Sequence, residues 1–217
     1  MDHETEEKPM KIAVLGATGR TGRLVVEEAH RRGHHVVAVV RDPARLGDLT
    51  PDGVATADGH DVGAVTAALA GVGAVVSALG PVAGSAPGVQ GDLTEVLVRA
   101  AREAGVRRVV VVTASGWVVD GDDPLSRYLA KPILARALRD ANAGFARAEP
   151  AVRASGLDWT IVRPPRLLDG AARGRYHERR DGNVRWRWSM RRADLAAAVC
   201  DVLVDPEAVG ATVSVAG

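Results

Sequence analysis

Cysteine is almost absent from this chain, and Cys200 is its single example. One cysteine excludes an internal disulfide, and such scarcity is typical of proteins in a reducing compartment, so we expect a cytoplasmic location. Cys200 stands in an apolar helical stretch, residues 195–200, which predicts a small buried side chain rather than a nucleophile. Long apolar runs are missing too, and no segment has the length needed to cross a bilayer.

The N-terminal segment, residues 1–9, is acidic and polar. It lacks the basic start and apolar core of a secretory signal, and we expect a flexible tail. Residues 10–217 have the length and apolar content of one ordinary domain that buries a substantial core.

Net charge is also nearly absent, because 28 Lys and Arg oppose 27 Asp and Glu to give +1. Bulk electrostatics therefore favours neither a nucleic acid nor a membrane as partner. The histidines share no metal-ligand spacing, so the sequence predicts no metal site. A small-molecule ligand is the partner that we expect.

A glycine-rich stretch, residues 16–22, dominates what is present. It follows an apolar run and opens a helical pattern, which predicts a strand, a tight turn and a helix N-terminus. Gly16 permits the turn, Gly19 permits close approach of a diphosphate, and Gly22 permits close packing of the helix on the sheet. The free N–H groups of the first helical turn then face the phosphates. The expected dinucleotide contacts of this loop are Gly16, Thr18, Gly19, Arg20, Thr21 and Gly22.

The spacing of this loop is G-x-x-G-x-x-G, written here GATGRTG. It resembles the atypical short-chain dehydrogenase/reductases, and most closely the NAD(P)H-binding group that includes NmrA-like and biliverdin-reductase-B (flavin reductase) types. The resemblance covers residues 10–217. It is strongest at 11–22, 36–45 and 149–165, and weakest at 116–142 and 166–190, where the substrate pocket is expected.

Strand-like and helix-like segments alternate along the chain, which predicts an α/β fold: a Rossmann-type, doubly wound parallel sheet in a single domain. We expect strands at 11–16, 36–40, 53–57, 74–79, 108–113, 157–163 and 212–215, and helices at 20–32, 61–69, 90–104, 124–140, 142–155 and 193–204.

Residues 175–190 alternate in polarity around Asp181-Gly182, which predicts a small hairpin on the substrate side. Its tryptophans and arginines are compatible with base stacking, but nothing else in the chain supports nucleic-acid binding, so an amphipathic hairpin is favoured.

Arg41 is the first residue beyond the expected second strand. An acid there is typical of NAD binding, whereas a basic residue meets the 2′-phosphate of NADP. A guanidinium holds a phosphate bidentately, and Arg20 is placed to close the same pocket. We therefore expect NADP (as NADPH) to be the cofactor; in the alternative, Arg41 is a solvated strand end paired with Asp42.

Two further groups are expected near the adenosine. Asp58 follows the third strand, and the resemblance places such an acid near the adenine; otherwise it is a polar residue leading into a helix. Ala78, Leu79 and Gly80 follow the fourth strand at its carboxyl end, where open α/β sheets bind ligands.

Ser115 follows the fifth strand, and the resemblance places a serine here near the nicotinamide. Its hydroxyl can hydrogen-bond a substrate carbonyl and stabilise negative charge as hydride arrives. The alternative is a serine that satisfies backbone groups at a strand end. Thr113 and Pro164, which close the fifth and sixth strands, complete the expected cofactor contacts.

The Tyr and Lys dyad of typical short-chain dehydrogenases is not evident. Tyr128 and Lys131 are three residues apart rather than four, and they lie well before the helix on which the resembled family usually carries this pair. The matching positions fall near Ala141 and Phe145, neither of which transfers a proton. Tyr176 and His177 are other candidate acids, and histidine titrates near neutral pH.

Three functions are compatible with this pattern. The first is an NADPH-dependent reductase of a flavin, a quinone-like molecule or another conjugated carbonyl, with the proton supplied by water. The second is an NmrA-like NADP-binding redox sensor without catalysis. The third is an isomerase, epimerase or cyclase of a biosynthetic pathway, because the fold alone does not specify the reaction.

Overall fold

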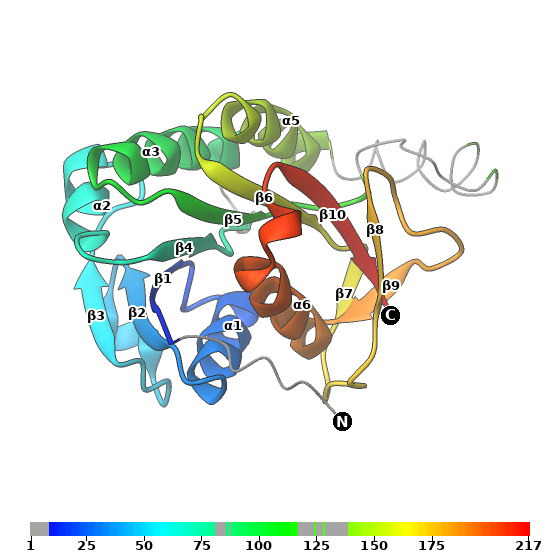
Figure 1. Ribbon diagram of the computed structural model, residues 1–217, viewed down its shortest axis with the longest axis horizontal. Helices are drawn as coiled ribbons and strands as arrows, with labels where there is room; N and C mark the ends of the chain where they lie inside the picture. The colour runs from blue at the N-terminus through cyan, green and yellow to red at the C-terminus, as the bar shows by residue number, and fades with distance from the viewer. Residues whose placement is uncertain (1–8, 81–85, 87, 117–123, 125–127, 129–138) are drawn as a thin grey trace.

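An eight-stranded sheet forms the centre of the computed structural model, which describes residues 9–80, 86, 88–116, 124, 128 and 139–217 (Figure 1). The strand order is β3-β2-β1-β4-β5-β6-β10-β8. Its strands are β1 (Lys11–Leu15), β2 (His35–Val40), β3 (Gly53–Thr56), β4 (Ala74–Ser77), β5 (Arg108–Val112), β6 (Asp158–Arg163), β8 (His177–Arg180) and β10 (Ala211–Ala216).

Seven of these strands run parallel, and β8 pairs antiparallel with β10 at the edge. The chain leaves β1 toward β2 and β3, then returns to β4 on the other side of β1. In doubly wound sheets, ligands bind in the crevice that forms at such a reversal, which lies here at the carboxyl ends of β1 and β4. The predicted fold class is confirmed.

Helices cover both faces of the sheet (Figure 1). One face carries α1 and α6, and the other carries α2, α3 and α5. The helices are α1 (Arg20–Arg31), α2 (Val62–Ala68), α3 (Val89–Glu103), α5 (Arg139–Arg153) and α6 (Arg192–Val204), with the short 3₁₀ segments η1 (Pro43–Leu46) and η3 (Pro206–Ala208).

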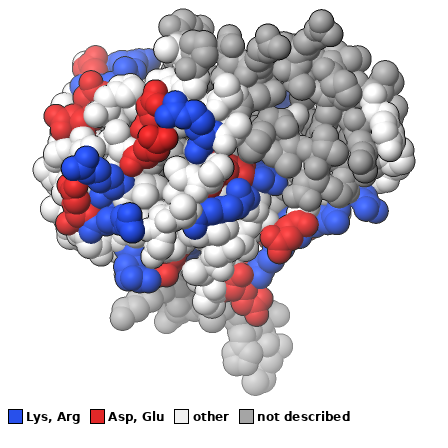
Figure 2. Space-filling view, turned by 90° about the horizontal axis from the view of Figure 1, so that it is seen from above, with Lys and Arg blue, Asp and Glu red and all other residues white. Residues whose placement is uncertain are grey.

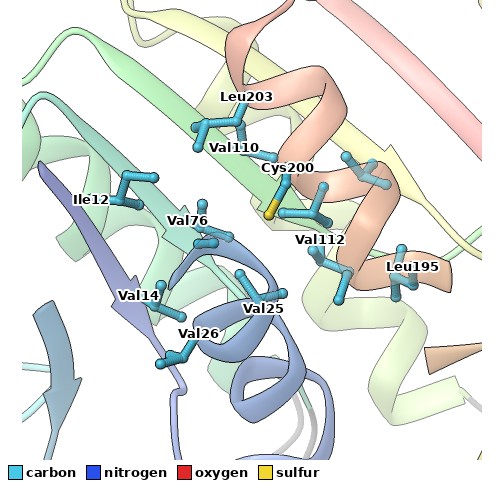
Figure 3. Packing of buried hydrophobic residues seen from close by; sticks show 14 of the residues in the cluster. Ile12, Val14, Val25, Val26, Val76, Val110, Val112, Leu195, Cys200 and Leu203 are labelled. Carbon is cyan, nitrogen blue, oxygen red and sulfur yellow. The ribbon is translucent and has the colours of Figure 1, made fainter. Parts of the chain in front are cut away.

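The alternation of side chains along the strands divides the core between the two faces. Ile12 and Val14 of β1 face α1 and α6, whereas Ala13 and Leu15 belong to the cluster on the other face. Figure 3 shows the first cluster, in which side chains from the sheet meet α1 and α6. Cys200 points into this layer and is buried, as predicted.

The helix ends follow their local signals. Gly33 and Gly105, just beyond α1 and α3, have φ of +83° and +72°, which glycine adopts without strain. Asp61 caps α2, because its Oδ1 accepts a hydrogen bond from the Ala64 amide at 3.0 Å.

The predicted hairpin at 175–190 is wrong. Its first arm, β8, pairs with β10 of the main sheet, and its second arm, β9 (Ser189–Arg191), pairs with β7 (Arg166–Leu168) in a separate two-stranded sheet. The chain changes direction at Asp181-Gly182. The strand before this point, β8, pairs with the open edge of the main sheet instead of with the second arm of the expected hairpin. The strand β7 directly follows Pro164-Pro165 and was not expected.

Most of the predicted helix at 124–140 lies outside the described residues. Within the described part of the chain, no helix is both long and apolar enough to cross a bilayer. Figure 2 shows acidic and basic side chains intermixed on the face seen from above. Elsewhere in the ion-pair pattern, Arg147 of α5 pairs with Asp92 and Glu95 of α3.

Candidate functional site

The glycine loop forms a narrow turn between β1 and α1. Gly16 has φ of +80°, and a Cβ added there lies 2.9 Å from the Ala78 carbonyl oxygen beyond β4. A Cβ added at Gly22 lies only 2.1 Å from the Gly16 carbonyl oxygen. Gly16 therefore permits close contact with the residues that follow β4. Gly22 permits α1 to pack against the loop that precedes it.

The N-terminus of α1 is suited to an anion. Gly19 occupies the N-cap, so no side chain caps the helix, and its first turn contains no acidic residue. The first N–H groups of a helix lack intrahelical acceptors and lie at the positive end of its dipole. Thr18 and Thr21 flank this turn and are half-buried. These residues fit the diphosphate of a dinucleotide.

The end of β4 forms the neighbouring wall of the crevice. Ala78 and Leu79 are half-buried and Gly80 is exposed, as expected for residues that line an opening. Gln90, at the start of α3, donates from Nε2 to the Leu79 carbonyl oxygen at 3.2 Å. Gln90 is buried, and its Oε1 has no partner among the described residues. Only the fold brings this amide to the crevice, so the sequence did not reveal it.

Arg41 is exposed beyond the carboxyl end of β2 and makes no ion pair within the described part of the chain. The alternative partner, Asp42, instead caps η1 through a hydrogen bond from the Ala44 amide to Oδ1 at 3.0 Å. Arg45 lies in the same short helix, is exposed, and adds a second cation that the sequence analysis passed over. The sequence signal for this second cation was the presence of two arginines four residues apart, just after the second strand.

Asp58 lies just after β3, at the same edge of the sheet, and is exposed. Its Oδ1 accepts a hydrogen bond from the His60 amide at 3.1 Å, which shapes the turn into α2. The structure therefore shows the local role of Asp58, and it leaves this carboxylate exposed just beyond the carboxyl end of β3.

Arg20, the first residue of α1, forms an ion pair with Asp169 in the loop after β7. Asp169 Oδ1 also accepts a hydrogen bond from Arg192 Nη1 at 2.5 Å, and the Asp169 carbonyl accepts one from Arg191. The Arg20 guanidinium expected at the 2′-phosphate is thus engaged elsewhere in this structure. Asp169 is a site-adjacent residue that the sequence analysis missed.

Ser115 lies at the carboxyl edge of the sheet beyond β5. Its amide donates to the Pro164 carbonyl oxygen at 2.8 Å, which ties it to the end of β6. The residue is half-buried, and its hydroxyl has no hydrogen-bond partner among the residues that the structure describes. This hydroxyl is therefore available to a ligand.

Thr113 and Pro164, the two remaining expected cofactor contacts, follow β5 and β6 directly. Both residues are buried. The Thr113 hydroxyl donates to Glu149 Oε1 at 3.0 Å, so it is committed to the protein interior. The contribution of Pro164 is its carbonyl, which holds Ser115.

The positions near the usual dyad lie on α5, where Phe145 is buried and apolar. Tyr128 is 74% exposed, and Lys131 lies outside the described residues. Nothing described here places a phenol and an ammonium together beside Ser115.

Tyr176 is not suited to be the proton donor. Its hydroxyl donates to the carboxylate of Asp201 on α6. Burial, followed by this hydrogen bond, raises the pKa of Tyr176 well above its ordinary value. His177 is exposed on the edge strand β8, which β6 and β10 separate from β5.

A metal centre is not formed by the described residues, since no three His, Cys, Asp or Glu side chains gather there with suitable geometry. Within the described part of the chain, the carboxyl edge of the sheet combines an uncapped, glycine-lined helix N-terminus with the half-buried hydroxyl of Ser115.

Comparison with known proteins establishes the family. Residues 16–206 match the model of the NAD(P)H-binding family, which covers most of the chain. The protein belongs to this family, and the resemblance to atypical short-chain dehydrogenase/reductases is confirmed.

Three relatives extend this result. The uncharacterized protein YwnB of Bacillus subtilis is 28% identical over 208 residues, covering 91% of this chain and 94% of YwnB. An NAD(P)H azoreductase of Xenophilus azovorans is 30% identical over 155 residues, covering 70% of this chain and 47% of the azoreductase. The solved structure of ChuY, an anaerobilin reductase of Escherichia coli O157:H7, superposes with a TM-score of 0.77 at 27% identity, covering 95% of this chain and 96% of ChuY.

Proposed function

We propose that this protein is an NADPH-dependent reductase that transfers a hydride to a flavin, a quinone-like molecule or another conjugated acceptor. The observation that carries the proposal is the free hydroxyl of Ser115 at the same sheet edge as an uncapped, glycine-lined helix N-terminus. The names of two relatives, an azoreductase and an anaerobilin reductase, support an extended conjugated acceptor.

The cofactor would be held by the loop from Gly16 to Gly22 and by Arg41. The α1 N–H groups bind the diphosphate, and the exposed guanidinium of Arg41 pairs with the 2′-phosphate. Bound NADPH supplies the hydride. Arg41 makes NADP the preferred dinucleotide, because an unphosphorylated ribose leaves this cation without an anionic partner.

Ser115 donates its hydroxyl hydrogen bond to the acceptor atom that gains electron density. Such a donor stabilises charge that develops in the transition state. One hydride and one proton are added to the acceptor in each turnover, and water supplies the proton because the described residues beside Ser115 include no acid–base dyad.

Turnover is tested by mixing the protein with NADPH and a flavin, a quinone, an azo dye and a linear tetrapyrrole, and following the nicotinamide absorbance. Ser115→Ala is expected to lower kcat by about 10–100-fold, because one charge-stabilising donor is lost. Thr66→Val removes a half-buried hydroxyl from α2, where it donates to the Val62 carbonyl, and serves as the matched control. Absence of NADPH oxidation with every acceptor would contradict the proposal.

An NADP-binding sensor without catalysis is the second candidate, favoured by the apolar Phe145 at the usual dyad position. It predicts tight NADP binding with no acceptor reduction. An isomerase or cyclase would convert its substrate with no net consumption of NADPH, which the same absorbance measurement detects.

A further inference from the structure

Glu149 of α5 is a fully buried carboxylate beside the strand ends that carry Ser115. Four hydrogen bonds reach it from three side chains. Oε1 accepts from Arg163 Nε at 2.9 Å and Thr113 Oγ1 at 3.0 Å, and Oε2 accepts from Arg163 Nη2 at 2.5 Å and Arg153 Nη1 at 3.0 Å.

The residues that bind Glu149 lie next to the site on both strands. Beyond β5, the amide of Thr113 donates to the Val162 carbonyl at 2.9 Å, and that of Ser115 donates to the Pro164 carbonyl at 2.8 Å. These two bonds continue the β5–β6 ladder to the edge of the sheet. Arg163 lies between the two acceptor residues. Glu149 therefore binds one residue on each strand of this ladder, Thr113 after β5 and Arg163 at the end of β6.

The chemistry of this cluster favours a single arrangement. The Arg163 guanidinium and the carboxylate form two parallel hydrogen bonds, which specify orientation as well as distance. Because the carboxylate is out of contact with water, each of its oxygens depends on these protein donors. The Thr113 hydroxyl is therefore held in one rotamer, and the main chain leading to Ser115 is held with it.

We propose that Glu149 is a positioning residue for the reaction, which acts through Thr113 and Arg163 to hold Ser115 in its productive place. This inference rests on the proposed reductase function. The hydroxyl of Ser115 is half-buried and free, so its direction depends on the main chain that carries it. Glu149 lies one helical turn beyond Phe145 on α5. The helix that carries the Tyr and Lys pair in typical short-chain dehydrogenases would here supply a supporting carboxylate instead.

The activity test uses Glu149→Gln, which keeps the shape of the side chain but removes the charge. It is expected to lower kcat by about 10-fold, as small displacements of reacting groups do, with the KM for NADPH unchanged. In a Ser115→Ala background the same change is expected to have no further effect on kcat. Thr113→Val, which removes only one hydrogen bond to Glu149, gives the same pattern at smaller size and covers a failure of the glutamine variant to fold.

The matched control is Glu28→Gln on α1, whose carboxylate also binds two arginines but lies away from β5. It is expected to leave kcat unchanged. If the loss of kcat caused by Glu149→Gln adds in full to the loss caused by Ser115→Ala in the double variant, the positioning role is overturned.

A second measurement does not depend on turnover. Hydrogen exchange of the Ser115 amide is expected to accelerate about 10-fold in Glu149→Gln, since local opening becomes easier, and to stay unchanged in Glu28→Gln. If wild-type protein reduces no acceptor, the proposed function fails, and this exchange rate still decides whether Glu149 holds Ser115. An unchanged rate at Ser115 in both Glu149→Gln and Thr113→Val would refute the inference.

Discussion

Arg20 and Asp169 form an ion pair that joins the glycine loop to the segment after β7. The side chains are 67% and 63% exposed, so solvent screens their attraction. Asp169 also binds Arg192 at the start of α6, which places one carboxylate between two cations at the rim of the cradle. If a dinucleotide binds as proposed, its phosphates would lie at this rim and compete with Asp169 for Arg20.

Asp169→Asn is therefore expected to tighten NADPH binding by about 2–5-fold at low salt. The change removes the competing ion pair with Arg20 and the repulsion between the carboxylate and the phosphates, and exposed charge interactions of this kind are worth under about 1 kcal/mol. The gain is expected to fade near 1 M salt, where the Debye length is about 3 Å. Fluorescence titration at both salt concentrations measures it. Asp48→Asn, which removes the ion pair of Arg23 on the same helix, is the control. Weaker binding in Asp169→Asn would contradict this role of the ion pair.

Arg41→Ala is expected to weaken NADPH binding by about 10–100-fold, since hydrogen bonds to charged groups are worth about 1.5–3 kcal/mol. NADH binding is expected to change little, because NADH carries no 2′-phosphate. Isothermal titration with both dinucleotides measures the difference. Lys11→Ala removes a cation at the amino end of β1, the opposite edge of the sheet, and is expected to affect neither. Equal losses for both dinucleotides would remove Arg41 from the specificity assignment.

Gly22→Ala and Gly63→Ala place the same methyl group in two helices with opposite expected results. At Gly22 the Cβ meets the Gly16 carbonyl oxygen at 2.1 Å, whereas at Gly63 its nearest neighbour is Asp61 Oδ1 at 3.4 Å. Gly63→Ala is expected to stabilise the fold by about 0.5–1 kcal/mol through helix propensity. Gly22→Ala is expected to lower Tm and abolish dinucleotide binding. Thermal unfolding with and without NADP measures both, and a Gly22→Ala variant that still binds NADP would contradict the cradle geometry.

The acid dependence of stability is expected to include Glu28. The hydrogen bond from Arg31, with a further one from Arg32, lowers the pKa of Glu28 below its ordinary value of 4.5. A lowered folded-state pKa contributes stability that is present above the unfolded value and is lost as pH falls through the folded value.

Urea unfolding of the wild type and Glu28→Gln tests this expectation. The wild type is expected to be more stable by about 0.5–1 kcal/mol at neutral pH, a partly exposed pair being of modest strength. The difference is expected to shrink below pH 4.5 as Glu28 takes up its proton. Glu27→Gln, an exposed position on the same helix, is the control. A difference that persists unchanged into acid would exclude the ionised Glu28 as its source.

Local signals predicted much of the fold. The buried run at 36–40 became β2, Gly33 and Gly105 followed their helices, and Asp61 capped α2. Such features depend on interactions within a few residues, which periodicity and capping rules describe. The hairpin at 175–190 failed because its arms choose partners far away in sequence, and a local pattern carries no information about free sheet edges.

The candidate site divides in the same way. The sequence by itself determined the glycine loop, the basic residue after β2 and the serine after β5, because each is tied to the end of a recognisable strand. Only the tertiary structure decided that Asp169 pairs with Arg20, 149 residues away, and that Glu149 accepts a hydrogen bond from the Thr113 hydroxyl, 36 residues away. These pairs form because parallel strands bring their carboxyl ends to one edge, where loops and helices distant along the chain meet.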